Sequence, residues 1–227
     1  MTSKWDTLLT AVLVLCAVST TSAVMYRQFS PLSRGITPQK PRFIEDWKSN
    51  LASGVRLGQK DAPVQIIEFA DFECPYCRDF HKELHMLRDH FTDQVTLTFV
   101  HFPLPGHRFA MPAARVAECA REQGRFEAMY DRLFDEQESF GLKSWTEYAS
   151  AADVSNLPAF QECIERKSPS VLIDLGRQLA AKLDVKGTPT VIINGWMLAT
   201  PPSANELDTM IKAVLAGKTP VSGTHTY

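Results

Sequence analysis

The sequence lacks several features that define large classes of proteins. Its 24 Lys and Arg residues nearly balance its 26 Asp and Glu residues, so the formal net charge is only −2. It has no basic patch and no aromatic residues interleaved with basic ones, which excludes a nucleic-acid-binding surface. It has no internal repeat at the periods of solenoids or propellers. With 227 residues and a hydrophobic fraction of 44%, the chain predicts one globular domain, or one domain with a large insertion.

The N-terminal segment carries no charged side chain over residues 7–26, and its first half is apolar. About 20 uncharged residues can just span a bilayer, whereas the small polar residues of the second half are typical of a cleaved signal peptide. Residues 1–26 are therefore interpreted as a signal peptide or a membrane anchor, with a buried core helix as the alternative. One basic residue precedes the segment and three follow it, a pattern that favours the opposite orientation. The redox chemistry described below nevertheless predicts export.

Hydrophobic periodicity predicts the order of the elements. Strands are expected at Val55–Gly58, Val64–Ala70, Val95–Val100, Thr190–Ile193 and Trp196–Ala199, and helices at Pro75–His90, at Ser203–Leu215 and, about five in number, within residues 108–185. A strand–helix–strand crossover implies parallel pairing, whereas the Asn194-Gly195 turn implies an antiparallel hairpin. The sequence therefore predicts an α/β fold, a thioredoxin-like sheet with a helical domain inserted in its middle.

This order divides the chain into segments. After the leader, the divisions are a linker (27–52), a thioredoxin-like domain in two parts (53–106 and 186–217), an inserted helical domain (107–185) and a C-terminal tail (218–227). Only about 25 residues separate the leader from the first predicted strand. That is too short for a separate dimerisation domain, so a monomer is expected.

The pair Cys74 and Cys77 is the strongest signal in the sequence. The motif Cys-Pro-Tyr-Cys follows an apolar strand and opens a helix, and Pro75 suits the first helical position, where its missing N–H costs nothing. Cys74 then lies at the helix N-cap, beside unpaired N–H groups and the positive end of the helix dipole. These groups favour the thiolate and lower the pKa of Cys74. Cys74 is therefore predicted to be the nucleophile, and Cys77 to resolve the mixed disulfide.

Two alternatives for this pair are less favoured. A four-ligand zinc site needs a second pair of Cys or His at suitable spacing, and the sequence has none. A purely structural disulfide between Cys74 and Cys77 is the other alternative. We therefore expect no metal and no cofactor other than the redox-active pair itself. Pro75 and Tyr76, which lie between the cysteines, are expected to influence the reduction potential of the pair and to contact the substrate.

The stretch Gly187-Thr188-Pro189-Thr190 precedes a predicted strand. Cis peptide bonds are essentially confined to bonds before proline. A cis bond at Thr188–Pro189 would place the backbone of Thr188 beside Cys74, where it could pair with an extended substrate as a strand does. An ordinary trans turn is the alternative. Thr188 and Pro189 are therefore candidate substrate-binding residues.

Glu68 lies in the strand just before the motif, among apolar neighbours. A buried carboxylate at this position would have a raised pKa and could accept the proton of Cys77, directly or through water. The alternative is a strand-edge carboxylate that faces solvent. The apolar neighbours favour the buried position, so Glu68 is a candidate catalytic residue.

Cys119 and Cys163 form the other candidate pair of cysteines. In an oxidising compartment two unpaired thiols are a liability, and a bridge between helices of the insert would stabilise that subdomain. The alternative is two separate buried thiols that act as small apolar residues.

His101 and His107 flank a Pro-rich turn. Helix-capping or surface roles are favoured for these two histidines over a place in the site.

These residues together resemble the DsbA-type thiol–disulfide oxidoreductases of the thioredoxin superfamily. The matching stretches cover most of residues 54–217 and comprise residues 68–77, 101–107, 113–114, 119–120, 123–126 and 187–190. The resemblance implies a helical insertion, a cis-Pro189 loop, Cys74 as nucleophile, Cys77 as resolving thiol and Glu68 as the buried acid.

The resemblance also implies a cellular role. It implies oxidation of dithiols in exported protein substrates in the periplasm or another extracytoplasmic compartment, and re-oxidation by a quinone-linked membrane partner. Two departures leave the direction of electron flow open: the dipeptide is Pro-Tyr where the best-known oxidase has Pro-His, and Thr188 precedes the proline as in some isomerases. A reductase or isomerase at the same site is thus the nearest alternative. A non-catalytic peptide-binding module is less favoured, because binding alone does not need two cysteines.

Overall fold

The computed structural model describes residues 40–166 and 170–221, together with Trp5, Leu8 and residues 12–17 and 19–21. The chain forms two compact units, Met1–Gln39 and Lys40–Tyr227. In the first unit, the described residues are helical. No helix within the described part of the chain is long and apolar enough to cross a bilayer. Much of the predicted leader, residues 27–39 of the predicted linker and residues 222–227 of the predicted tail lie outside the described residues.

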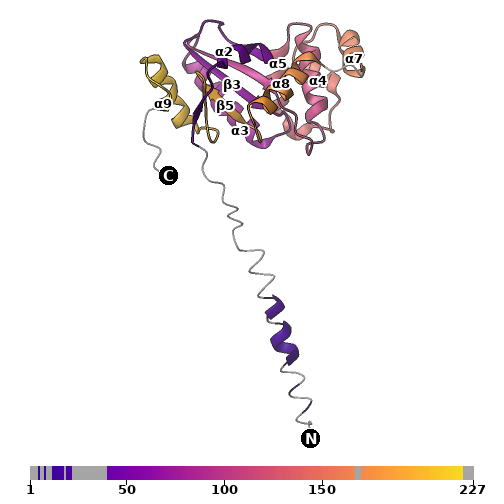
Figure 1. Ribbon diagram of the computed structural model, residues 1–227. Helices are drawn as coiled ribbons and strands as arrows, with labels where there is room; N and C mark the ends of the chain where they lie inside the picture. Colours follow the sequence, from indigo (N-terminus) through magenta and orange to yellow (C-terminus); the bar gives the residue numbers. More distant parts are fainter. Residues whose placement is uncertain are drawn as a thin grey trace. The chain divides into compact units, whose positions relative to one another are not determined.

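The second unit contains a sheet and the helices that cover it (Figure 1). Its strands are β1 (Arg42–Phe43), β2 (Val55–Leu57), β3 (Val64–Ala70), β4 (Val95–His101), β5 (Thr190–Ile193) and β6 (Trp196–Met197). Its α-helices are α2 (Trp47–Asn50), α3 (Pro75–His90), α4 (Ala110–Arg121), α5 (Phe126–Asp135), α6 (Trp145–Ala151), α7 (Leu157–Glu165), α8 (Val171–Lys182) and α9 (Ala204–Leu215), with 3-10 turns η1 (Leu51–Ser53) and η2 (Gln137–Ser139).

The sheet has the predicted topology. Its strand order is β1-β6-β5-β3-β4-β2, with β3 and β4 parallel and the other pairs antiparallel. The crossover through α3 therefore gives the expected parallel pair, and the turn at Asn194-Gly195 gives the expected hairpin of β5 and β6. Helix α9 begins, as expected, at Ser203, which forms a capping box with Glu206. The predicted thioredoxin-like fold with inserted helices is confirmed.

The alternation of side chains along β3 divides the core between the two faces of the sheet. Ile66 and Ala70 point into the larger hydrophobic cluster, which also contains Cys77 and residues of α4 to α7. Ile67 and Phe69 point into the smaller cluster on the other face, with Leu179 of α8. Because Glu68 lies between Ile67 and Phe69, it shares the face of Ile66, the face that carries the cysteine pair.

Two parts of the predicted organisation differ from the structure. The predicted linker over residues 27–52 is wrong for its second half, because residues 42–52 form β1, α2 and part of η1, and Trp47 packs against the smaller cluster. Helix α8, predicted within the inserted domain, packs on β4, and a Cβ at Gly176 would clash with the carbonyl oxygen of His101. Helix α8 therefore covers the sheet, while α4 to α7 lie at the end of the unit opposite α9 (Figure 1).

Candidate active site

Cys74 is the N-cap residue of α3, directly after the buried strand β3. Its backbone is extended (φ −74°, ψ 121°), and Pro75 occupies the first turn of the helix. The Cys74 carbonyl accepts the first helical hydrogen bond, from the Arg78 N–H at 3.2 Å. The local sequence explains this geometry, because proline fixes a helical φ and needs no acceptor for an N–H. The sulfur therefore lies where the N–H groups of the first turn are unpaired.

The pKa of Cys74 is lowered from 9.0 to about 5. The largest cause is a hydrogen bond from the Cys77 side chain, which outweighs the opposing effect of burial. The Thr188 side chain and the backbone N–H groups of Cys77 and Tyr76 lower the pKa further. At neutral pH the sulfur is therefore a thiolate, the form that attacks disulfides and leaves readily from them.

Cys77 has the opposite environment. It is fully buried, and burial is the main reason why its pKa is raised well above 9.0. Its hydrogen bond to Cys74 and the negative charges of Glu68 and Cys74 raise the pKa further. The two sulfurs, one turn apart, thus differ in charge: Cys74, which is 3% exposed, carries the anion, and the fully buried Cys77 carries the neutral thiol. This division suits the roles of attacking and resolving groups.

Glu68 is fully buried, and neither carboxylate oxygen has a hydrogen-bond partner among the described residues. Burial, and then the negative charge of Cys74, raise its pKa from 4.5 to about 8. Its buried position agrees with the expectation from sequence. The carboxyl group is coupled to both sulfurs through their charges and can exchange a proton at physiological pH.

The peptide bond between Thr188 and Pro189 is cis, as expected from the resemblance. Cys74 Sγ lies 3.4 Å from the Thr188 carbonyl oxygen, so this loop lies directly beside the reactive sulfur. Tyr76 is 72% exposed. Tyr76, Thr188 and Pro189 line a groove of about 650 Å³ that runs between α3 and the start of α9. Three of the four candidate substrate-binding residues thus line this groove, and the fourth, Pro75, follows Cys74 directly in the chain.

The turn between β3 and α3 is held by Asp71, a residue that the sequence interpretation left out. Its side chain is fully buried, and it accepts hydrogen bonds from the Glu73 N–H (2.8 Å), the Leu104 N–H (2.9 Å) and His107 Nδ1 (2.7 Å). His107 therefore anchors a loop next to the site.

The capping or surface role predicted for His101 is wrong, because its ring is buried at the end of β4 and lies 3.1 Å from the buried Glu118.

Gln137 is a second positioning residue that the sequence interpretation missed. It lies in η2, is 8% exposed, and its Nε2 donates to the carbonyls of Phe72 (2.7 Å) and Cys74 (3.0 Å). It thus ties the helical insert to the turn that carries the nucleophile. No local sequence feature marks Gln137, because it lies in a polar run. Both of these hydrogen bonds reach residues at least 63 positions away in the sequence.

We expect Gln137→Ala to lower the free energy of unfolding by about 1–3 kcal/mol, because it leaves a buried carbonyl without its donor. Urea unfolding would measure the change. Gln123 provides a matched control, since its side-chain amide also bridges backbone groups, at Asn156, but in an exposed position. Gln123→Ala should cost less than about 0.5 kcal/mol. Equal losses in the two variants would contradict the role given to Gln137.

Cys119 of α4 and Cys163 of α7 form a disulfide that closes a loop with a sequence separation of 44. The bridge favoured from sequence is thus present in the structure. It lies within the helical insert, and the cysteines described as free are Cys16, Cys74 and Cys77. Within the described residues, no group of three or more His, Cys, Asp or Glu is arranged to hold a metal ion.

Replacing both cysteines of this bridge, as Cys119→Ala/Cys163→Ala, should lower the free energy of unfolding by about 4 kcal/mol, because the unfolded chain regains the entropy of a loop of this length. Chemical unfolding of the oxidised proteins would measure the loss. The variant should retain the chemistry of Cys74. A loss below about 1 kcal/mol would show that the bridge contributes little.

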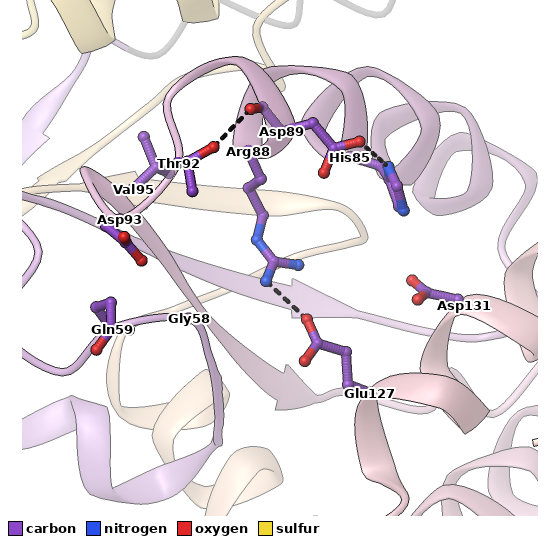
Figure 2. Close-up of a pocket in the computed structure, with 10 residues that line it drawn as sticks. All are labelled: Gly58, Gln59, His85, Arg88, Asp89, Thr92, Asp93, Val95, Glu127 and Asp131. Carbon is purple, nitrogen blue, oxygen red and sulfur yellow. Dashed lines mark hydrogen bonds and ion pairs between the residues drawn. The ribbon is translucent and has the colours of Figure 1, made fainter. Parts of the chain in front are cut away.

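A second cavity has a volume of about 230 Å³, and Figure 2 shows the side chains that line it. Two pairs of its charged side chains contact each other: Arg88 contacts Glu127 at 2.8 Å, and His85 contacts Asp89 at 3.4 Å. Neither cysteine of the pair nor the Pro189 loop lines it. The groove beside Cys74 is therefore the candidate active site.

Comparisons with known proteins agree with this fold and site. The family model described as Thioredoxin matches residues 50–213. The chain is 30% identical over 168 residues to "Probable disulfide bond formation protein D" of Bacillus cereus, a match that covers 70% of this chain and 76% of that protein. It is 34% identical over 164 residues to "Na(+)/H(+) antiporter NhaA 1" of Mycolicibacterium vanbaalenii, a match that covers 71% of this chain and 26% of the antiporter.

The chain thus spans about a quarter of the length of the antiporters that it matches. Among solved structures, the crystal structure of oxidised BdbD from Bacillus subtilis is similar with a TM-score of 0.65 and 20% identity, over 74% of this chain and 95% of that one. At this identity the likeness concerns the fold.

Fold and site together define a DsbA-like protein of the thioredoxin superfamily, as the sequence motifs suggested. The chain belongs to the thioredoxin family.

Proposed function

We propose that this protein is an extracytoplasmic thiol–disulfide oxidoreductase that introduces disulfides into exported proteins through Cys74 and Cys77. The observation that carries the proposal is the pKa of Cys74, lowered to about 5 at the N-terminus of α3. A stabilised thiolate stabilises the reduced form, and therefore makes the Cys74–Cys77 disulfide a stronger oxidant. The name of the Bacillus cereus relative, which refers to disulfide bond formation, supports the same direction.

The size of this effect can be estimated from the pKa of Cys74. At pH 7, a Cys74 pKa of about 5 stabilises the reduced form by about 2 kcal/mol more than the pKa of about 7 in thioredoxin does. Because 30 mV corresponds to about 1.4 kcal/mol, the reduction potential should lie about 50 mV above thioredoxin's, at about −220 mV or higher.

The proposed reaction has two exchanges. A substrate thiolate attacks Cys74 of the oxidised pair, the Cys74–Cys77 bond breaks, and Cys77 leaves and takes a proton. Glu68 is the proposed donor of this proton, directly or through water. The second thiolate of the substrate then attacks the substrate sulfur that is bonded to Cys74. This forms the substrate disulfide, and Cys74 leaves as the stabilised thiolate. The substrate loses two electrons and the cysteine pair gains them. Re-oxidation reverses these steps with a quinone-linked membrane protein as the proposed acceptor.

Three features support the proposed location and assembly. The Cys119–Cys163 disulfide is a kind of bond that persists in oxidising compartments. The uncharged segment over residues 7–26 is suited to an export signal or an anchor. The short connection between this segment and the first strand supports a monomer. Ion transport is not part of the proposal, because the shared segment is about a quarter of the antiporters.

Equilibration of the protein with glutathione buffers of known potential tests the proposal. The fraction of oxidised Cys74–Cys77, followed by alkylation and mass measurement, should give a reduction potential of about −220 mV or higher. A potential at or below thioredoxin's, about −270 mV, would overturn the oxidase assignment and favour the reductase or isomerase alternative.

A further inference from the structure

The groove beside Cys74 has an uneven distribution of charge. Three carboxylate residues line it, Asp79, Glu83 and Glu206, and no Lys or Arg lies among the described residues that line it. Its remaining lining is apolar or uncharged and includes Tyr76, Phe80 and the Pro189 loop. A substrate segment that binds at Cys74 must therefore lie against a surface whose charged side chains are all carboxylates.

Asp79 and Glu83 form the acidic wall of this groove. They lie one and two turns after Tyr76 along one face of α3, since residues three, four and seven apart share a helix face. Asp79 is 64% exposed in its side chain, and its one ion contact, with Arg78 Nε, is long at 3.8 Å. Arg78 donates instead to Glu138 at 2.8 Å. Glu83 has no ion pair within the described part of the chain. Both charges are thus available to a ligand.

The other groups around the groove do not neutralise this wall. One carboxylate oxygen of Glu206 accepts hydrogen bonds from the backbone N–H and the hydroxyl of Ser203 (2.8 and 2.7 Å). Lys186, next to the loop in sequence, pairs with Asp184. The wall therefore keeps its negative charge.

We infer that the acidic wall selects substrates with Lys or Arg close to the reactive cysteine, so that the preferred substrates are basic segments of exported proteins. This inference rests on the proposed function, and it names the substrate class of that site. The distance from Tyr76 to Glu83 along α3 is roughly 10 Å, which an extended peptide covers in about three residues. The selected basic residues therefore lie within about three positions of the substrate cysteine. Charge complementarity of this kind acts mainly on recognition and encounter.

Three synthetic dithiol peptides of equal length would test the inference, with Lys, Ser or Glu at the positions flanking the first cysteine. The oxidised protein should oxidise the Lys peptide with a kcat/KM about tenfold above that of the Glu peptide at low ionic strength. The ratio should shrink toward unity at about 1 M salt, where screening acts over about 3 Å. This salt series needs no variant.

The double variant Asp79→Asn/Glu83→Gln should reduce the ratio of the Lys-peptide rate to the Glu-peptide rate to about twofold or less. Asp79 and Glu83 can be replaced without changing the groups that lower the pKa of Cys74, which are Cys77, Thr188 and Tyr76. The matched control Glu45→Gln/Glu162→Gln makes the same change in net charge at residues that do not line the groove. It should keep the wild-type ratio.

The outcomes separate the inference from the proposed function. If none of the three peptides is oxidised, the proposed function fails. If all three are oxidised at equal rates, or if the double variant keeps the tenfold ratio, the proposed function stands and the selection by charge is overturned.

Discussion

Replacing Cys74 by serine is expected to reduce disulfide transfer to background, a loss of about a thousandfold or more. A hydroxyl at this position does not ionise near neutral pH, so the helix N-terminus has no anion to stabilise and no mixed disulfide can form. The rate is measured by the oxidation of a reduced dithiol peptide by stoichiometric protein.

Cys77→Ser should behave differently from Cys74→Ser. Because the nucleophile remains and the resolving thiol is gone, mixed disulfides at Cys74 should accumulate and be visible on non-reducing gels.

The control for these variants is the pair Cys119→Ala/Cys163→Ala. It removes two cysteines that are bonded to each other in the helical insert, and it should keep the wild-type rate of transfer. Retention of activity in Cys74→Ser, or loss of it in the control, would mean that the reactive sulfur has been assigned to the wrong pair.

The second large effect concerns Glu68. We expect Glu68→Gln to slow proton transfer at Cys77 by about a hundredfold or more, because an amide cannot exchange a proton with a buried thiol. The effect is observed in stopped-flow measurements of re-oxidation, as a longer lifetime of the mixed disulfide that Cys77 resolves. The negative charge of Cys74 is one cause of the raised pKa of Glu68. When Cys74 is in a disulfide this charge is absent, so Glu68 then gives up its proton more readily and can act as a base toward Cys77 during re-oxidation.

Stability should respond to the same substitution, in a direction that depends on pH. The pKa of Glu68 is raised from 4.5 to about 8 in the folded protein, so the folded state binds the proton more tightly than the unfolded state across this range. The free energy of unfolding of the reduced protein therefore falls as pH rises from about 4.5, by about 3 kcal/mol at pH 7 from this group. Glu68→Gln removes this loss, and should unfold at higher urea concentration than wild type at pH 7 but not at pH 4.

Glu118 is the matched control, because it is also a buried carboxylate in the same unit. Burial acts to raise its pKa, but hydrogen bonds from His101 and Arg121 outweigh burial and lower it. Glu118→Gln should therefore destabilise the protein at pH 7 and leave the lifetime of the mixed disulfide unchanged. Equal kinetic effects of the two substitutions would mean that Glu68 acts through stability alone.

The parts of the site that could be predicted from sequence are those marked by residues close to one another in the chain. A buried strand, a proline at the first helical position and the spacing of two cysteines are local features, and they placed Cys74 at the start of α3 correctly. The buried position of Glu68 followed from its apolar neighbours. Residues 42–52 were misassigned because a two-residue strand and a four-residue helix are too short to show a period. Asp71 and Gln137 were missed because their hydrogen bonds reach loops and turns that are distant in sequence.

The central claim is that the Cys74 sulfur is an anion at neutral pH, and a pH titration of thiolate absorbance in the reduced protein tests it most directly. The account predicts a transition with a pKa of about 5 that is absent from Cys74→Ser. A reduced wild-type protein whose first thiol ionises only near 9, the ordinary value for cysteine, would contradict it.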